Sequence, residues 1–154
     1  MIKNNETMNK RIILWLVLLA MAVGVRAQTG LSVSGVFEGK VVPRSRMVET
    51  RVRGRALSKY QLSTYRSLRF LATAAELEKT RKLFDSDAAS ARSSYVKTKG
   101  KHSATTIVSL PPRGSANRFL CLQYRPENKV YRVTIVYMEG EVKDLSTLRE
   151  LLEN

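Results

Sequence analysis

Three β-rich runs separated by short polar linkers make up most of the last third of the sequence. Residues 104–110, 118–124 and 130–138 carry mainly β-branched, aromatic and aliphatic side chains. The linkers contain Pro, Gly and Asn, and connections this short join antiparallel neighbours. The sequence therefore predicts a three-strand antiparallel meander near the C-terminus.

The last of these runs is apolar on both of its faces, which predicts a central position in the sheet. One face carries Tyr131, Val133, Ile135 and Tyr137, and the other carries Val130, Thr134, Val136 and Met138. A weak period-2 pattern at residues 31–37 indicates a further strand, and another strand is expected at about residues 64–71. Residues 47–55 alternate more clearly and predict a half-buried strand with Val48 and Val52 facing inward.

Two helices are expected as well. Residues 73–95 contain no Gly or Pro, and their apolar side chains recur at helical spacing, followed by a polar loop at 96–103. Asp144 is a suitable N-cap for a short C-terminal helix whose apolar stripe is Leu145, Leu148, Leu151 and Leu152. The expected fold class is α+β, an antiparallel sheet with one long helix packed on a face.

The expected hydrophobic core draws on all of these segments. It consists of Val48, Val52, Leu68, Phe70, Leu77, Phe84, Ala88, Ile107, Leu120, Leu122, Val133, Ile135, Leu148 and Leu151.

The N-terminus has the pattern of a secretory signal peptide. Lys3, Lys10 and Arg11 precede fourteen uncharged, mostly apolar residues at 12–25, and Val25 and Ala27 match the small-residue cleavage pattern. Fourteen residues are short for a membrane span, which needs about 20. We expect cleavage after Ala27, a single domain at 28–154, an exported location in the periplasm or outside the cell, and no transmembrane span after cleavage.

Charge is the strongest functional signal in the chain. The whole sequence has 27 Lys and Arg against 13 Asp and Glu, a net charge of +14. Four of the basic residues and one acidic residue lie in residues 1–27, so residues 28–154 carry +11. An apolar fraction of 44% excludes a disordered chain, and one Cys excludes a disulfide framework.

Side chains with catalytic potential are few. The single histidine, His102, lies in a Lys-rich polar segment, and Asp85 and Asp87 are two apart on the expected helix, so all three are expected to be solvated. Ser94 and Lys97 match the S-x-x-K spacing without its companion motifs. Cys121 lies among apolar residues and is expected to be a buried structural thiol. We expect no enzymatic activity, no metal and no cofactor.

Arginines recur at period 2 in the basic strand. Arg51, Arg53 and Arg55 are expected on one face, with Arg44 and Arg46 just before it; we call these five residues the arginine comb. Guanidinium groups spaced about 6 to 7 Å apart match successive phosphates, sulfates or carboxylates of a polymer. The alternative is that exposed basic residues protect an edge strand from aggregation.

Several short segments give the chain a family resemblance. They are Val36-Phe37-Glu38-Gly39-Lys40, residues 53–62 (RGRALSKYQL) with 65–68, Leu110-Pro111-Pro112, Asn117-Arg118-Phe119 and Tyr137-Met138-Glu139-Gly140. With these segments the chain resembles small exported proteins of unknown function from Bacteroides-type Gram-negative bacteria. The resemblance implies an envelope or secreted location and no known activity.

Together these features predict an exported, non-enzymatic binding module. Its expected partner is an anionic polysaccharide or lipopolysaccharide, held by the arginine comb. A structural protein that recruits another envelope protein is the alternative. Export argues against nucleic acid as the ligand.

Overall fold

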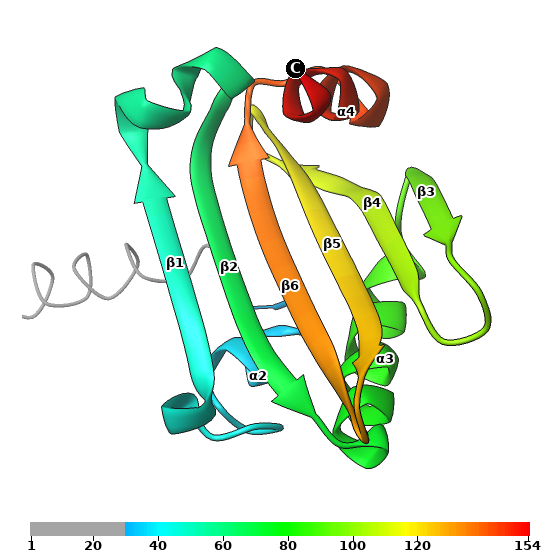
Figure 1. Ribbon diagram of the computed structural model, residues 1–154. Helices are drawn as coiled ribbons and strands as arrows, with labels where there is room; N and C mark the ends of the chain where they lie inside the picture. The colour runs from blue at the N-terminus through cyan, green and yellow to red at the C-terminus, as the bar shows by residue number, and fades with distance from the viewer. Residues whose placement is uncertain (1–29) are drawn as a thin grey trace, which may run out of the picture. The chain divides into compact units, whose positions relative to one another are not determined.

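A six-stranded antiparallel sheet is the frame of the protein in the computed structural model, which describes residues 30–154 (Figure 1). The strands are β1 (Met47–Arg53), β2 (Leu62–Ala72), β3 (Ser93–Thr98), β4 (Ala104–Arg113), β5 (Ala116–Glu127) and β6 (Val130–Gly140). Their order across the sheet is β1-β2-β6-β5-β4-β3. The predicted signal peptide, residues 1–27, lies outside the described residues.

The structure confirms the C-terminal meander and the α+β class. Strands β4, β5 and β6 pair in sequence, and β6 lies inside the sheet between β2 and β5. The strands extend further than the apolar runs indicated, so the turns shrink to residues 114–115 and 128–129. Gly114 and Asn128 have the positive φ values, 61° and 58°, that such tight turns require.

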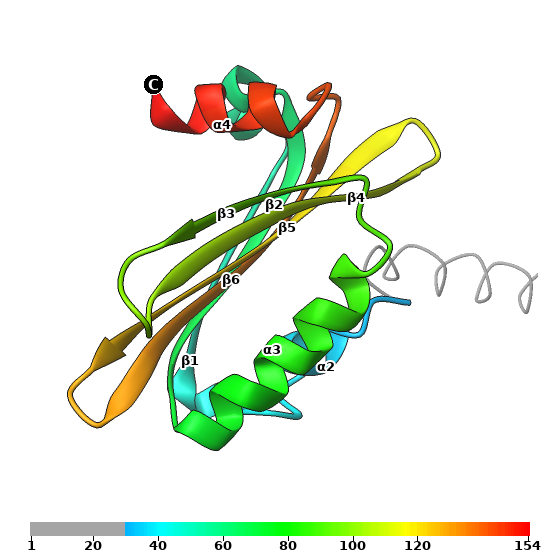
Figure 2. The ribbon, with the colours of Figure 1, turned by 90° about the vertical axis from the view of Figure 1, so that its right-hand side faces the viewer.

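Helices cover the two faces of the sheet unequally (Figure 2). Helix α3 (Ala74–Ala88) and the short α2 (Ser34–Phe37) lie on one face, which we call the helix side. Helix α4 (Leu145–Glu153) lies at one end of the opposite face, where it contacts the 3₁₀ helix η2 (Gly54–Tyr60). No helix within residues 30–154 lies over the rest of that opposite face, and we call it the open side.

Most of the predicted core is buried. The buried members are Leu68, Phe70, Leu77, Phe84, Ile107, Leu120, Leu122, Val133, Ile135 and Leu148, whereas Val52, Ala88 and Leu151 are only partly buried. The prediction for Val48 is wrong, because its side chain is 68% exposed. Val48 points to the open side from β1, an edge strand, and nothing in the described chain packs over it.

The predicted strand at residues 31–37 is also wrong. Residues 34–37 form α2, and Val33, Val36 and Phe37 bury their side chains on the helix side. Their spacing of three and four residues is that of one helical face, and it outweighs the weak alternation of the neighbouring serines.

The long helix is shorter than predicted. It begins after Thr73, whose side chain forms a capping box with Glu76, and it ends at Ala88. Residues 93–98, predicted as helix end and loop, form edge strand β3 and pair with β4. Tyr95 packs against the cluster below α4, and its ring lies 3.5 Å from the Arg149 guanidinium. These tertiary contacts favour the extended conformation over a weakly helical sequence.

A second hydrophobic cluster fills the end of the sheet covered by α4. Leu145 and Leu148 of α4 pack there with residues of η2, β4, β5 and β6, and Asp144 caps the helix as predicted by accepting a hydrogen bond from Thr147 N at 2.8 Å. Gly140 allows β6 to approach the start of β2 closely. A Cβ atom at Gly140 would lie 2.4 Å from Gln61 O, so no larger residue fits without a shift of the backbone.

A buried carboxylate joins α3 to the segment that contains α2. Asp87, expected to be solvated, is 7% exposed. Its two oxygens accept hydrogen bonds from Ser32 N at 2.7 Å and Val33 N at 2.9 Å. These N–H groups precede the first turn of α2 and have no partner within that helix. Asp85, on the same helix, is exposed as expected.

We expect Asp87→Ala to lower the free energy of unfolding by about 1–3 kcal/mol, because the buried N–H of Val33 and the partly buried N–H of Ser32 lose their acceptor. Asp85→Ala is the matched control and should change the stability by less than about 0.5 kcal/mol. Denaturant unfolding followed by circular dichroism measures both. Equal effects of the two substitutions would contradict the role assigned to Asp87.

Candidate functional site

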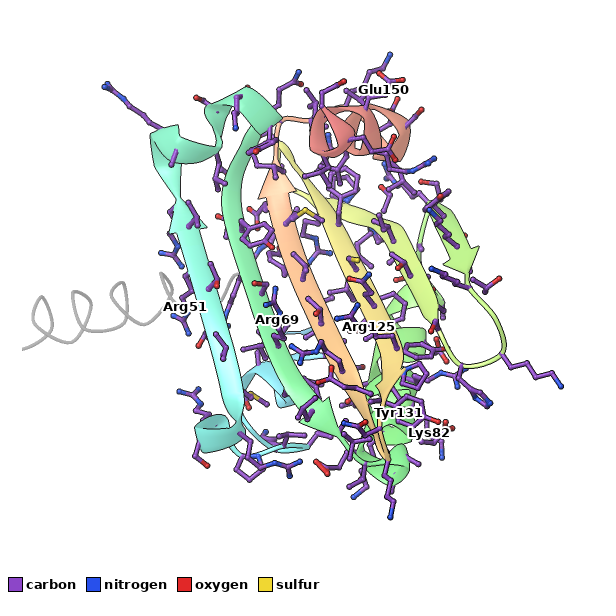
Figure 3. The ribbon with its side chains drawn as sticks, viewed as in Figure 1. Arg51, Arg69, Lys82, Arg125, Tyr131 and Glu150 are labelled. Carbon is purple, nitrogen blue, oxygen red and sulfur yellow. The ribbon has the colours of Figure 1, made fainter. Side chains whose placement is uncertain are left out.

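Three arginines lie together on the open side of the sheet. Arg69 is on β2, Arg132 on β6 and Arg125 on β5, and these strands are direct neighbours. Arg69 is opposite Thr134, which is opposite Gln123, and Arg132 is opposite Arg125. Figure 3 shows Arg69 and Arg125 on either side of β6. Because neighbouring strands are about 4.8 Å apart and residues rise about 3.3 Å along a strand, the three side chains start within about 12 Å of one another.

The arginines surround a shallow hollow with a volume of about 270 Å³. Its lining consists of Arg69, Gln123, Arg125, Arg132 and Thr134, and we call this set the arginine hollow. The lining contains three cations, one amide and one hydroxyl, and no carboxylate.

One carboxylate neutralises part of this charge from the edge of the hollow. Glu127 pairs with Arg132 through two hydrogen bonds, and this contact lowers the pKa of Glu127. Arg69 and Arg125 form no hydrogen bond or salt bridge with the rest of the described chain. Their guanidinium donors are therefore available to an external anion.

Such an arrangement suits binding of an anionic group. Guanidinium groups hold phosphate, sulfate or carboxylate through paired N–H donors, and the Gln123 amide and Thr134 hydroxyl add neutral donors. None of the five lining side chains is a nucleophile with an adjacent base.

The structure divides the predicted arginine comb among three elements. Arg51 and Arg53 share one face of β1, Arg55 lies in η2, and Arg44 and Arg46 lie in the 3₁₀ helix η1 (Arg44–Arg46). Of the three arginines predicted to share one strand face, Arg51 and Arg53 do so and Arg55 does not. Strand β1 is an edge strand, which is the condition for the protective role considered as the alternative.

Two arginines of the comb form salt bridges with carboxylates of the same chain. Arg51 and Arg66 both donate to Glu49 on the helix side. Burial opposes ionisation of Glu49, but these two hydrogen bonds outweigh it and lower the pKa of Glu49. Arg46 forms a salt bridge with Glu76 at 3.1 Å and donates to Leu71 O at 2.9 Å. The other three comb residues, Arg44, Arg53 and Arg55, form no such contact within the described chain. The arginine hollow differs from the comb in that its three arginines, from three neighbouring strands, line one concave surface.

The hollow was missed in the sequence because its arginines are far apart in the chain. A usable signal was present in β6, where Arg132 interrupts an otherwise apolar or neutral face. Arg125 and Arg69 join Arg132 only through the strand register, and a sequence pattern within one strand does not contain that register.

The other chemical candidates are separated by the fold. His102 is exposed in the turn between β3 and β4. Ser94 and Lys97 lie three residues apart on β3, so their side chains point to opposite faces instead of meeting as they would on a helix. No group of three or more His, Cys, Asp or Glu side chains within residues 30–154 is arranged to hold a metal ion.

Family comparison gives one match. The model of a family of unknown function, DUF6108, matches residues 20–152. The chain belongs to this family. No curated protein and no solved structure matches the chain. The DUF6108 match agrees with the resemblance to uncharacterised proteins and supplies no activity. None of the helices that the structure describes in this family member is long and apolar enough to cross a membrane.

Cys121 lies beside the α4 cluster and is partly buried. Burial raises the pKa of its thiol to about 11. The thiolate is the reactive form, so the fraction of reactive thiol at pH 8 is far below that of a free cysteine.

We expect iodoacetamide to alkylate Cys121 at pH 8 at least about 100-fold more slowly in the folded protein than in guanidinium chloride. Mass spectrometry over time measures both rates. Raising the pH toward the thiol pKa should accelerate the reaction of the folded protein. Comparable rates in the folded and unfolded states at pH 8 would contradict the burial of this thiol.

Proposed function

We propose that this member of DUF6108 is an exported, non-enzymatic module that binds an anionic envelope or extracellular polymer through the arginine hollow. The observation that carries the proposal is the convergence of Arg69, Arg125 and Arg132 on the open side around one hollow. The signal-peptide pattern of residues 1–27 and the +11 charge of residues 28–154 support it. The ligand classes are anionic polysaccharide and lipopolysaccharide.

The arginine comb remains a second candidate surface for the same ligands. Arg51 and Arg53 lie on the helix side of β1, whereas the hollow is on the open side. A polymer that contacts both must therefore cross the β1 edge. Substitutions in the two surfaces separate their contributions.

Protein from the natural host should have lost residues 1–27, because the peptidase is expected to cleave after Ala27. Intact-mass measurement of the purified protein identifies the first residue, with the chain made without export as the control. A mass that includes residues 1–27 would contradict processing at this site.

Three double variants test the binding surface, each removing two positive charges. Arg69→Gln with Arg125→Gln alters the hollow, Arg51→Gln with Arg53→Gln alters the comb, and Lys79→Gln with Lys82→Gln alters the exposed face of α3. Each pair of substitutions lowers the net charge by the same amount. A difference in affinity among the three variants therefore shows which surface contacts the polymer. Arg132 is left intact so that Glu127 keeps its partner.

We expect the hollow variant to bind its best polymer at least about tenfold more weakly, since two charge-assisted contacts are lost. Its affinity should also depend less on salt. Titrations with dextran sulfate, alginate and lipopolysaccharide at about 50 and about 300 mM salt measure this.

Equal affinities of the three variants, or no binding to any polymer, would overturn the proposal. A larger loss in the comb variant would move the site to β1. Co-purification of a defined protein that survives high salt would instead favour the partner-recruiting alternative.

A further inference from the structure

Two exposed apolar side chains lie directly beside the arginine hollow. Val48 is 68% exposed and Leu71 is 42% exposed. Val48 of β1 is opposite Arg69 of β2, and Leu71 follows Arg69 by two residues on the same strand. Side chains at these positions share the open side of the sheet with Arg69. The apolar pair therefore borders the cationic surface on its β1 side.

The location of this pair distinguishes it from the other large exposed apolar residues of the described chain. Val96 lies on edge strand β3 at the far side of the sheet, and Leu152 lies on α4. Single exposed apolar residues are common on protein surfaces. Val48 and Leu71, in contrast, lie next to three arginines. The combined surface can contact an anionic group at the arginines and an apolar group at Val48 and Leu71.

A ligand made only of sugars and acidic groups gains little from Val48 and Leu71. A ligand with an anionic group joined to an alkyl chain gains from both surfaces, because burying a methylene group contributes about 0.8 kcal/mol when it leaves water completely. Strand β1 is the edge of the sheet, so an alkyl chain placed on Val48 has open space beyond the last strand.

We propose that the arginine hollow recognises an anionic amphiphile. Its phosphate or carboxylate group lies among Arg69, Arg125 and Arg132, and its alkyl part lies on Val48 and Leu71. This inference rests on the proposed function and names the part of the ligand that is bound. A lipid-linked envelope polymer, with acidic groups next to its lipid, has this chemistry.

Alkyl phosphates provide a direct test because their headgroup stays constant while the chain grows. Methyl, butyl and octyl phosphate, each below its micelle concentration, are titrated into the protein by calorimetry. We expect the affinity to rise at least about tenfold from methyl to octyl phosphate. Arg69→Gln with Arg125→Gln should weaken binding of every member of the series.

Substitution of the apolar pair should remove only the chain-length dependence. Val48→Thr with Leu71→Thr places β-branched residues, which favour strands, at both positions, so folding should be retained, and thermal unfolding checks this. The expected result is unchanged binding of methyl phosphate and loss of most of the gain with octyl phosphate. Val96→Thr with Leu152→Gln is the control and should bind like the unaltered protein.

The outcomes separate this inference from the proposed function. If methyl and octyl phosphate bind equally and both require the arginines, the amphiphile inference is wrong and the anion site stands. If octyl phosphate binds regardless of the arginines, or if no alkyl phosphate binds, the inference is overturned, and polymer titrations alone decide the proposed function. A gain with chain length that survives Val48→Thr with Leu71→Thr also overturns it.

Discussion

The antiparallel register of β2, β6 and β5 is the constraint on which the rest of the structure depends. Side chains alternate strictly along a strand, so the register assigns every residue of these three strands to one face of the sheet. On the helix side of the sheet, the register places Leu68 beside Ile135 and Ile135 beside Leu122, which builds the core under α3. On the open side, the same register places Arg69, Arg132 and Arg125 together.

Unequal coverage of the sheet leaves part of this register exposed on the open side. Helix α4 and η2 bury one end of the second face around Leu145 and Leu148, and they stop before the row that contains Arg69, Thr134 and Gln123. A strand that is apolar on both faces near Val136 and Met138 is thus polar on one face near Arg132 and Thr134. The change from buried to open along β6 is what creates a cationic surface next to a hydrophobic cluster.

Errors in the sequence-based description have a common physical origin. Short segments such as residues 31–37 and 91–98 have little intrinsic preference, so their conformation follows from what they contact. Asp87 draws the N–H groups of Ser32 and Val33 toward α3, and the cluster below α4 holds Tyr95 on β3. Longer patterns, such as those of β2, β6 and α4, were described correctly because many residues in each indicate the same structure.

The sequence alone determined the α+β class, the C-terminal meander, the central position of β6 and the basic character of the domain, because these follow from local periodicity and composition. It also indicated arginines as candidates for binding an anion, but it grouped them on and just before one strand. Only the tertiary structure decided which arginines meet, since neighbours across a sheet come from residues as distant as Arg69 and Arg132. It also decided that Arg66 shares Glu49 with Arg51 and that Arg46 pairs with Glu76, because these two contacts join residues of different elements.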